Sequence, residues 1–238
     1  MRAIGTWCAV SALCTLGLTA TSLAGERLAA NDGQPPSQAA PAKPLVGSVS
    51  PIPDATWNAM QGRSWHPSLG CPSRNQLALV HVPYLDFEGR PQTGELIVAR
   101  SVARDVLAAF NEIYRSGAFR FASIQLIYKF GGDDSRSMNA NNTSAFNCRT
   151  VLGTRRLSEH AFGRAIDINP IQNPWVSRRE TDPPAGRAYD SPAERAVARL
   201  GMIRPGDVVT KAFAKIGWKW GGRWRHSKDY QHFSRSGR

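Results

Sequence analysis

Residues 158–169 read SEHAFGRAIDIN and hold side chains that can bind a metal. Two isoleucines alternate with polar residues around Asp167, the period of two that is typical of a half-buried strand, so Asp167 is expected to face away from the core. His160 lies seven residues earlier, and Gly163 can supply the bend that returns its imidazole to the carboxylate. A catalytic zinc site has three protein ligands and an open position, and this stretch offers two of them.

The third ligand must come from elsewhere, and residues 217–233, which read GWKWGGRWRHSKDYQHF, offer His226 and His232. Asp229 precedes His232 by three residues, so the two are expected on one side of a turn. There one can bind the metal while the other acts on a metal-bound water. His226 lies in a basic run and is expected to face solvent, which makes His232 the preferred ligand.

Together these stretches resemble the zinc D-alanyl-D-alanine carboxypeptidases. This family includes the vancomycin-resistance dipeptidases and carboxypeptidases and the phage L-alanyl-D-glutamate endolysins. The motifs that carry the resemblance are Ser-x-His-x-x-Gly-x-Ala-x-Asp and, far downstream, Trp-x-Trp-Gly-Gly-x-Trp and Asp-x-x-His-Phe. The resemblance extends over roughly residues 65 to 234.

The resemblance implies one Zn²⁺ ion held by His160, Asp167 and His232. It also implies that a zinc-bound water attacks the peptide carbonyl with Asp229 as the general base. The vancomycin-resistance members have glutamate at this place, whereas the endolysin-like branch has aspartate, as here.

The resemblance further implies an arginine that binds substrate and stabilises the oxyanion, and Arg136 is the preferred residue. The planar guanidinium suits a carboxylate or a polarised carbonyl. Arg149, in the stretch SAFNCR, is the alternative. Ser158 is expected to bond within its loop or to substrate, and a plain turn-forming role is an equal alternative.

The N-terminal residues of the chain indicate export. Residues 1–24 have the basic start, apolar run and small-x-small ending of a secretory signal, with an uncleaved membrane anchor as the rival interpretation. Residues 25–55 have the Ala- and Pro-rich composition of a disordered linker, which leaves 56–238 as the peptidase domain. A net charge of +12 predicts attraction to a polyanion such as an acidic wall polymer.

After removal of the signal, Cys71 and Cys148 remain, an even number in an oxidising compartment. A disulfide between them and two separate buried thiols are both open.

The pattern of strands and helices predicts an α+β fold, a small antiparallel sheet with flanking helices, and the resemblance implies a hedgehog-type or D-Ala-D-Ala-peptidase-like architecture. Helices are expected to begin at Ser101 and Asp207 and to end at Gly117 and Gly217. The other expected elements are a hairpin of 77–86 with 94–98, a strand at 124–130, a loop at 133–157 and a short helix at 193–200.

Three functions are compatible with these features. The first is an exported zinc peptidase that cuts peptidoglycan stem peptides, as a D-alanyl-D-alanine carboxypeptidase or an L-alanyl-D-glutamate endopeptidase. It is expected as a monomer in the periplasm, cell envelope or medium, with membrane contact only through the signal or anchor. The second is a non-catalytic zinc-containing wall-binding module, against which Asp229 argues. The third is a nucleic-acid-binding protein, which the export signal opposes.

Overall fold

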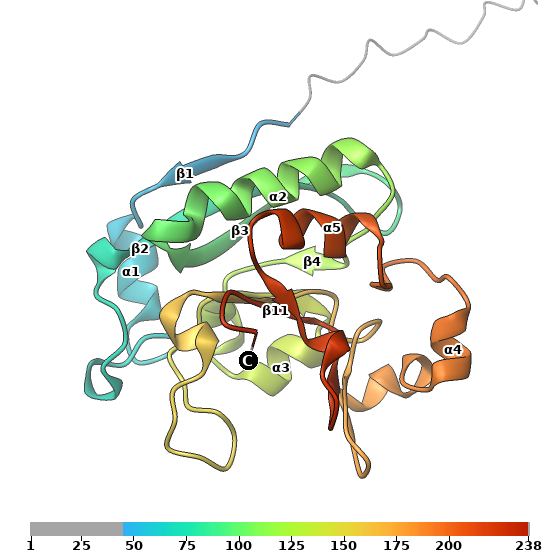
Figure 1. Cartoon of the computed structure of the whole chain (residues 1–238). Helices are drawn as coiled ribbons and strands as arrows, with labels where there is room; N and C mark the ends of the chain where they lie inside the picture. The colour runs from blue at the N-terminus through green and yellow to red at the C-terminus, as the bar shows by residue number, and fades with distance from the viewer. Residues whose placement is uncertain (1–44, 238) are drawn as a thin grey trace, which may run out of the picture. The chain divides into compact units, whose positions relative to one another are not determined.

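A computed structural model describes residues 45–237 of the chain (Figure 1). The expected signal at 1–24 and most of the expected linker lie outside the described residues. The described part begins earlier than the predicted domain, because Ser48–Ser50 forms strand β1 and helix α1 begins at Asp54. β1 pairs with β2 through Ser48 and His81, so its backbone hydrogen bonds place this stretch with the fold rather than with the linker.

The first sheet is antiparallel, in the order β1-β2-β3, with β2 at Leu77–Leu85 and β3 at Pro91–Ala99. The predicted hairpin is therefore confirmed. Both faces of this sheet are buried, because alternate residues of β2 enter two different apolar clusters. Helix α2, Ala103–Ser116, packs on β2 and shares the main cluster with α5, Val208–Lys215 (Figure 1).

The two long helices end as predicted, at glycines with left-handed backbone. Gly117 has φ of 63° and Gly217 has φ of 77°. Asp207 caps α5 by accepting a hydrogen bond from the Thr210 amide. The predicted start of α2 at Ser101 is wrong, because residues Arg100–Val102 form a 3-10 turn that precedes the helix.

A second sheet contains Asp167 and His232, two of the predicted metal ligands. Its order is β6-β11-β9, with bounds Ala165–Asp167, His232–Ser234 and Lys219–Trp220. A third sheet, β10-β7-β8, joins Lys228–Asp229, Trp175–Val176 and Thr181–Asp182. The structure is thus an α+β fold of small, largely antiparallel sheets with flanking helices, as predicted.

Two predicted elements are wrong in part. The strand expected at 124–130 shortens to β4, Ser123–Ile124, and is followed by the 3-10 turn Ile127–Phe130. β4 pairs in parallel with β5, Asn142–Thr143. The loop expected at 133–157 contains helix α3, Asp134–Asn139, because Asp133 accepts a hydrogen bond from the Arg136 amide and caps it.

The irregular segment after β6 is held by a half-buried arginine, Arg195. It contains the 3-10 turn Pro184–Tyr189 and helix α4, Pro192–Ala196, near the predicted short helix. Arg195 donates to the carbonyls of Gln172, Tyr189 and Ile203, and its guanidinium lies 3.6 Å from the centre of the Tyr230 ring. Burial lowers the pKa of Arg195 to about 10.

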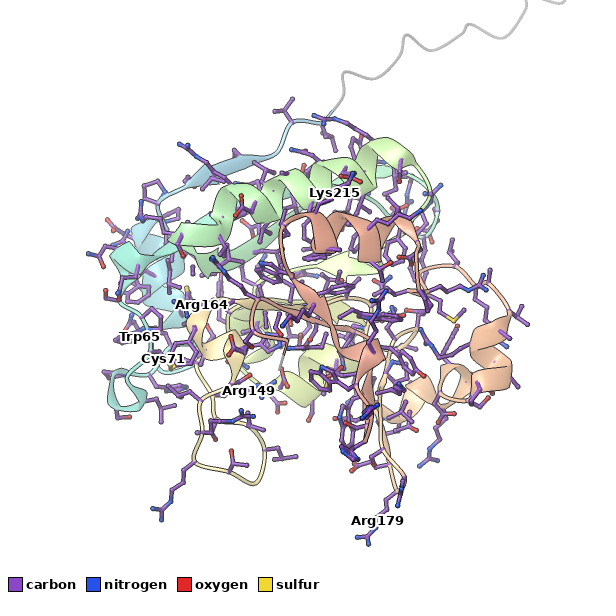
Figure 2. All side chains as sticks on the ribbon, viewed as in Figure 1. Trp65, Cys71, Arg149, Arg164, Arg179 and Lys215 are labelled. Atoms are coloured by element: carbon purple, nitrogen blue, oxygen red, sulfur yellow. A yellow bond between two sulfur atoms is a disulfide. The ribbon has the colours of Figure 1, made fainter. Side chains whose placement is uncertain are left out.

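Cys71 and Cys148 form a disulfide, so the first of the two alternatives is confirmed (Figure 2). The bond lies beside the smaller apolar cluster, which contains Cys148. It ties the segment before β2 to the residue that precedes Arg149. No helix among residues 45–237 is long and apolar enough to cross a membrane.

Candidate metal centre and active-site pocket

Strand pairing brings Asp167 and His232 together. In the antiparallel pair of β6 and β11, His232 lies opposite Asp167 and Phe233 lies opposite Ile166. Because side chains alternate along a strand, Ile166 and Phe233 enter the main core while Asp167 and His232 share the other face. The His232 Nδ1 to Asp167 Oδ1 distance is 2.9 Å.

A short 3-10 turn, Glu159–Phe162, delivers His160 to the same point. Ser158 begins the turn, and its Oγ accepts a hydrogen bond from the His160 amide at 3.3 Å. Gly163 ends it with φ of 63°, and a Cβ there would lie 2.4 Å from a backbone nitrogen of β3. The predicted bend at Gly163 is therefore confirmed, and both its backbone conformation and its surroundings favour glycine.

The three predicted ligands form one buried cluster. His160 Nε2 lies 3.1 Å from Asp167 Oδ2 and 3.3 Å from His232 Nδ1. Each residue offers a donor atom, and these atoms all lie within 4.8 Å of one another. Two imidazole nitrogens and a carboxylate oxygen are donors that suit Zn²⁺.

The surrounding hydrogen bonds prepare these donors for a cation. His160 Nδ1 lies 2.6 Å from the Ala145 carbonyl oxygen, which only accepts, so Nδ1 carries the proton and Nε2 keeps a lone pair toward the cluster. Burial alone would raise the pKa of Asp167, but the charge and hydrogen bonds of His160 and His232 hold it well below its usual range. The donor set therefore fits a metal ion.

The cluster lies in the wall of a pocket of about 420 Å³. Besides the three donors and Asp229, the pocket is lined by aromatic, aliphatic, basic and hydroxyl side chains and by one glutamate. These residues are Arg149, Val151, Arg156, Leu157, Ser158, Glu159, Phe162, Trp175, Trp224 and Ser236.

Asp229 is an acid of the pocket besides Asp167 and Glu159, and it is held by β10, where it pairs with Trp175 of β7. Its Oδ1 is buried and has no hydrogen-bond partner within residues 45–237. Burial raises the pKa of Asp229 to about 7, and the charge of Asp167 adds to the rise while that of His232 opposes it. A carboxylate with such a pKa can both accept and release a proton near neutral pH.

Arg149 lines the pocket, as does Arg156, whereas the preferred Arg136 does not. Arg136 lies on α3 and is exposed, because the capped helix replaces the expected loop. Arg149 Nη2 forms an ion pair with Asp134 Oδ2 at 2.6 Å, and its buried Nε has no hydrogen-bond partner in the described part of the chain. Figure 2 labels Arg149 beside the gold segment that leads to His160.

Two features of the site had no signal in the sequence. Trp175 lines the pocket and reaches Asp229 through strand pairing, and the group that holds His160 Nδ1 is the backbone carbonyl of Ala145. Ser158 caps its turn and also lines the pocket, so a bond within the loop is confirmed and its contact with substrate stays a prediction. His226 is exposed and lies outside the metal cluster, as expected.

Two histidines and an aspartate beside an acid with a raised pKa, in an open pocket, define a metallopeptidase type of site. Residues 152–235 match the family model described as D-alanyl-D-alanine carboxypeptidase. The match spans all three candidate metal donors and Asp229, and it confirms the resemblance to the zinc D-alanyl-D-alanine carboxypeptidases. No curated protein and no solved structure gives a significant match to the chain.

Proposed function

We propose that the protein is an exported zinc-dependent peptidase that hydrolyses peptidoglycan stem peptides, with D-alanyl-D-alanine carboxypeptidase as its activity. One observation carries the proposal. His160, Asp167 and His232 converge in a pocket that also holds the unpartnered carboxylate oxygen of Asp229. A site built only to hold a metal has no need of a second buried acid, so Asp229 argues against the wall-binding module.

His160 Nε2, His232 Nδ1 and the Asp167 carboxylate would hold the metal. A zinc ion bound there supplies Lewis-acid polarisation of a carbonyl and makes a water acidic enough to lose its proton near neutral pH. In this proposal Asp229 Oδ1 takes that proton and passes it to the leaving amine. The pKa of Asp229, which burial raises to about 7, suits both steps.

Arg149 takes the substrate-binding role in place of Arg136. Its guanidinium lies in the pocket wall, where a planar donor set can bind a terminal carboxylate or the oxyanion of the reacting carbonyl. Asp134 orients the guanidinium through its ion pair. This arrangement supports a carboxypeptidase, since that activity must recognise a free C-terminal carboxylate.

L-alanyl-D-glutamate endopeptidase activity is the alternative within the same chemistry. Arg156 and Trp224 of the pocket also line a second, neighbouring hollow, where a longer peptide could make further contacts. The proposal also includes export to the periplasm, cell envelope or medium, and a monomeric state. The signal-like composition of residues 1–24 and the net charge of +12 support the export and wall-polymer parts of it.

The test uses the chain from residue 25 with purified stem pentapeptide muropeptides, followed by mass spectrometry. We expect release of a terminal D-alanine that stops with a chelator and returns with zinc. His160→Ala and Asp229→Ala should each lower kcat by at least about 10²-fold, and only His160→Ala should also lose bound zinc.

The outcomes separate the alternatives. Cleavage after L-alanine would replace the carboxypeptidase with the endopeptidase. A protein that binds one equivalent of zinc and cleaves neither bond would instead be the wall-binding module. Arg136→Gln serves as the matched control for Arg149→Gln, because only the latter should raise KM.

A further inference from the structure

A second hollow adjoins the pocket and is not used by the proposed chemistry. It has a volume of about 390 Å³, and Arg156 and Trp224 line both hollows, so the two are neighbours. Its remaining lining residues are Arg225, His226, Ser227 and Gly237.

The second hollow is suited to an anion. Arg156 and Arg225 are exposed, and neither has an ion-pair partner within residues 45–237. Among the described residues, no acidic side chain lines the hollow. Guanidinium groups bind carboxylates through paired hydrogen bonds, and the Ser227 hydroxyl and the His226 ring can add polar contacts.

Trp224 is shared by the second hollow and the surroundings of the metal site. Its Nε1 donates to the Gly237 carbonyl at 3.1 Å, and its carbonyl accepts from Lys228 Nζ at 2.6 Å. The centre of its ring lies 5.6 Å from that of His232. The indole that lines the second hollow is therefore also a neighbour of one of the metal donors.

We propose that the second hollow is a subsite for the free carboxylate of an acidic residue in the substrate, apart from the bond that is cut. The inference rests on the proposed function and deepens it, because it names a substrate feature that the metal chemistry does not require. A substrate whose carboxylate is amidated keeps the same shape but loses the charge that Arg156 and Arg225 bind.

The test compares two synthetic stem pentapeptides that differ only in whether the free carboxylate of the D-glutamate residue is amidated. We expect the protein to prefer the acidic peptide by about ten- to hundredfold in kcat/KM, mainly through KM. The double variant Arg156→Gln/Arg225→Gln should bring this ratio close to one.

The matched control is Arg104→Gln/Arg115→Gln, which removes the same charge from the exposed face of α2. This control should keep the preference. If it loses as much preference as the first double variant, the attraction is a general effect of net charge and the subsite is overturned. An equal kcat/KM for both peptides in the unaltered protein overturns it as well.

Calorimetry separates this inference from the proposed function. The zinc-loaded Asp229→Ala variant is titrated with each pentapeptide, so binding is measured without cleavage. If the unaltered protein cleaves neither peptide but Asp229→Ala binds the acidic one more tightly through Arg156 and Arg225, the peptidase fails and the subsite stands. If both peptides are cleaved and bound equally, the peptidase stands and the subsite fails.

Discussion

Asp86 closes the β2–β3 hairpin through four hydrogen bonds. Its Oδ1 accepts from the amides of Glu88 and Arg90, and its Oδ2 accepts from Arg90 Nε and Gln92 Nε2, at 2.8 to 3.1 Å. Burial alone would raise the pKa of Asp86, but these hydrogen bonds, from the backbone and side chain of Arg90 above all, lower it below its usual value. The ionised form therefore stabilises the hairpin.

The sign of this shift gives a pH-dependent prediction. A carboxyl whose pKa is lower in the folded state stabilises the fold above its unfolded pKa of about 4 and loses this effect as the pH falls through the folded pKa. Asp86→Asn should lower the free energy of unfolding at pH 7, and the difference from the unaltered protein should shrink below about pH 4. Urea unfolding between pH 3 and 7 measures it, and a constant difference across that range would contradict it.

At the residue scale, the three residues of the candidate metal cluster were predictable and the arginine that lines the pocket was not. His160, Asp167 and His232 stand out by residue type, by the bend at Gly163 and by the family motif. Nothing in the spacing distinguishes Arg136 from Arg149, and Arg136 lies on the helix that Asp133 caps, where a loop was expected.

At the scale of elements, the 3-10 turn Gly221–Arg223 packs directly behind the site. A Cβ on Gly221 would lie 2.7 Å from the Asp229 carbonyl oxygen, 2.9 Å from the Asp229 Cβ and 3.4 Å from the His232 Cβ. Gly221→Ala should therefore shift β10 against β11 and weaken zinc binding by about tenfold or more. Competition with a chromogenic chelator measures the affinity.

Gly206→Ala is the control for this variant. Gly206 has φ of 79°, so alanine is strained there, but no atom lies within 4 Å of the added Cβ. This control should lose some stability and keep its zinc affinity. If Gly221→Ala binds zinc as tightly as the unaltered protein, the turn does not position the donors.

Elements with a strong local pattern were predictable, whereas those defined by distant partners were not. α2 and α5 have one apolar face and a terminal glycine, and β2 and β3 are long enough to show as strands. The apolar run that begins at Ile124 instead leaves its sheet after this residue, since β5, with which β4 pairs, is equally short. Sequence alone carries no signal for the length of a partner strand.

At the scale of the whole molecule, the disulfide links residues 77 positions apart. Cross-linking a loop of this length restricts the unfolded chain, so Cys71→Ser/Cys148→Ser should lower the free energy of unfolding by about 2–5 kcal/mol. KM should also rise, because Cys148 directly precedes Arg149 and anchors its segment beside the smaller cluster. Urea unfolding and peptide kinetics measure the two effects.

The unaltered protein with a reducing agent is the control for this double variant. Both samples lack the crosslink, so their unfolding midpoints should agree. If the double variant is as stable as the oxidised protein, the bond does not contribute to the stability of the fold.

Asp167 of β6 and His232 of β11 lie opposite each other, and this pairing limits the insertions and deletions that the protein can tolerate. Inserting one codon between Gly221 and His232, with the pairing of β11 kept, would place Gln231 over Asp167, and deleting one codon would place Phe233 there. Either change would turn the histidine into the core. Point substitutions in this stretch do not shift the register. Besides the demands on Gly221, Asp229 and the residues that line the pocket, the stretch is thus fixed in length, whereas the exposed residues 152–156 bear no such restriction on length.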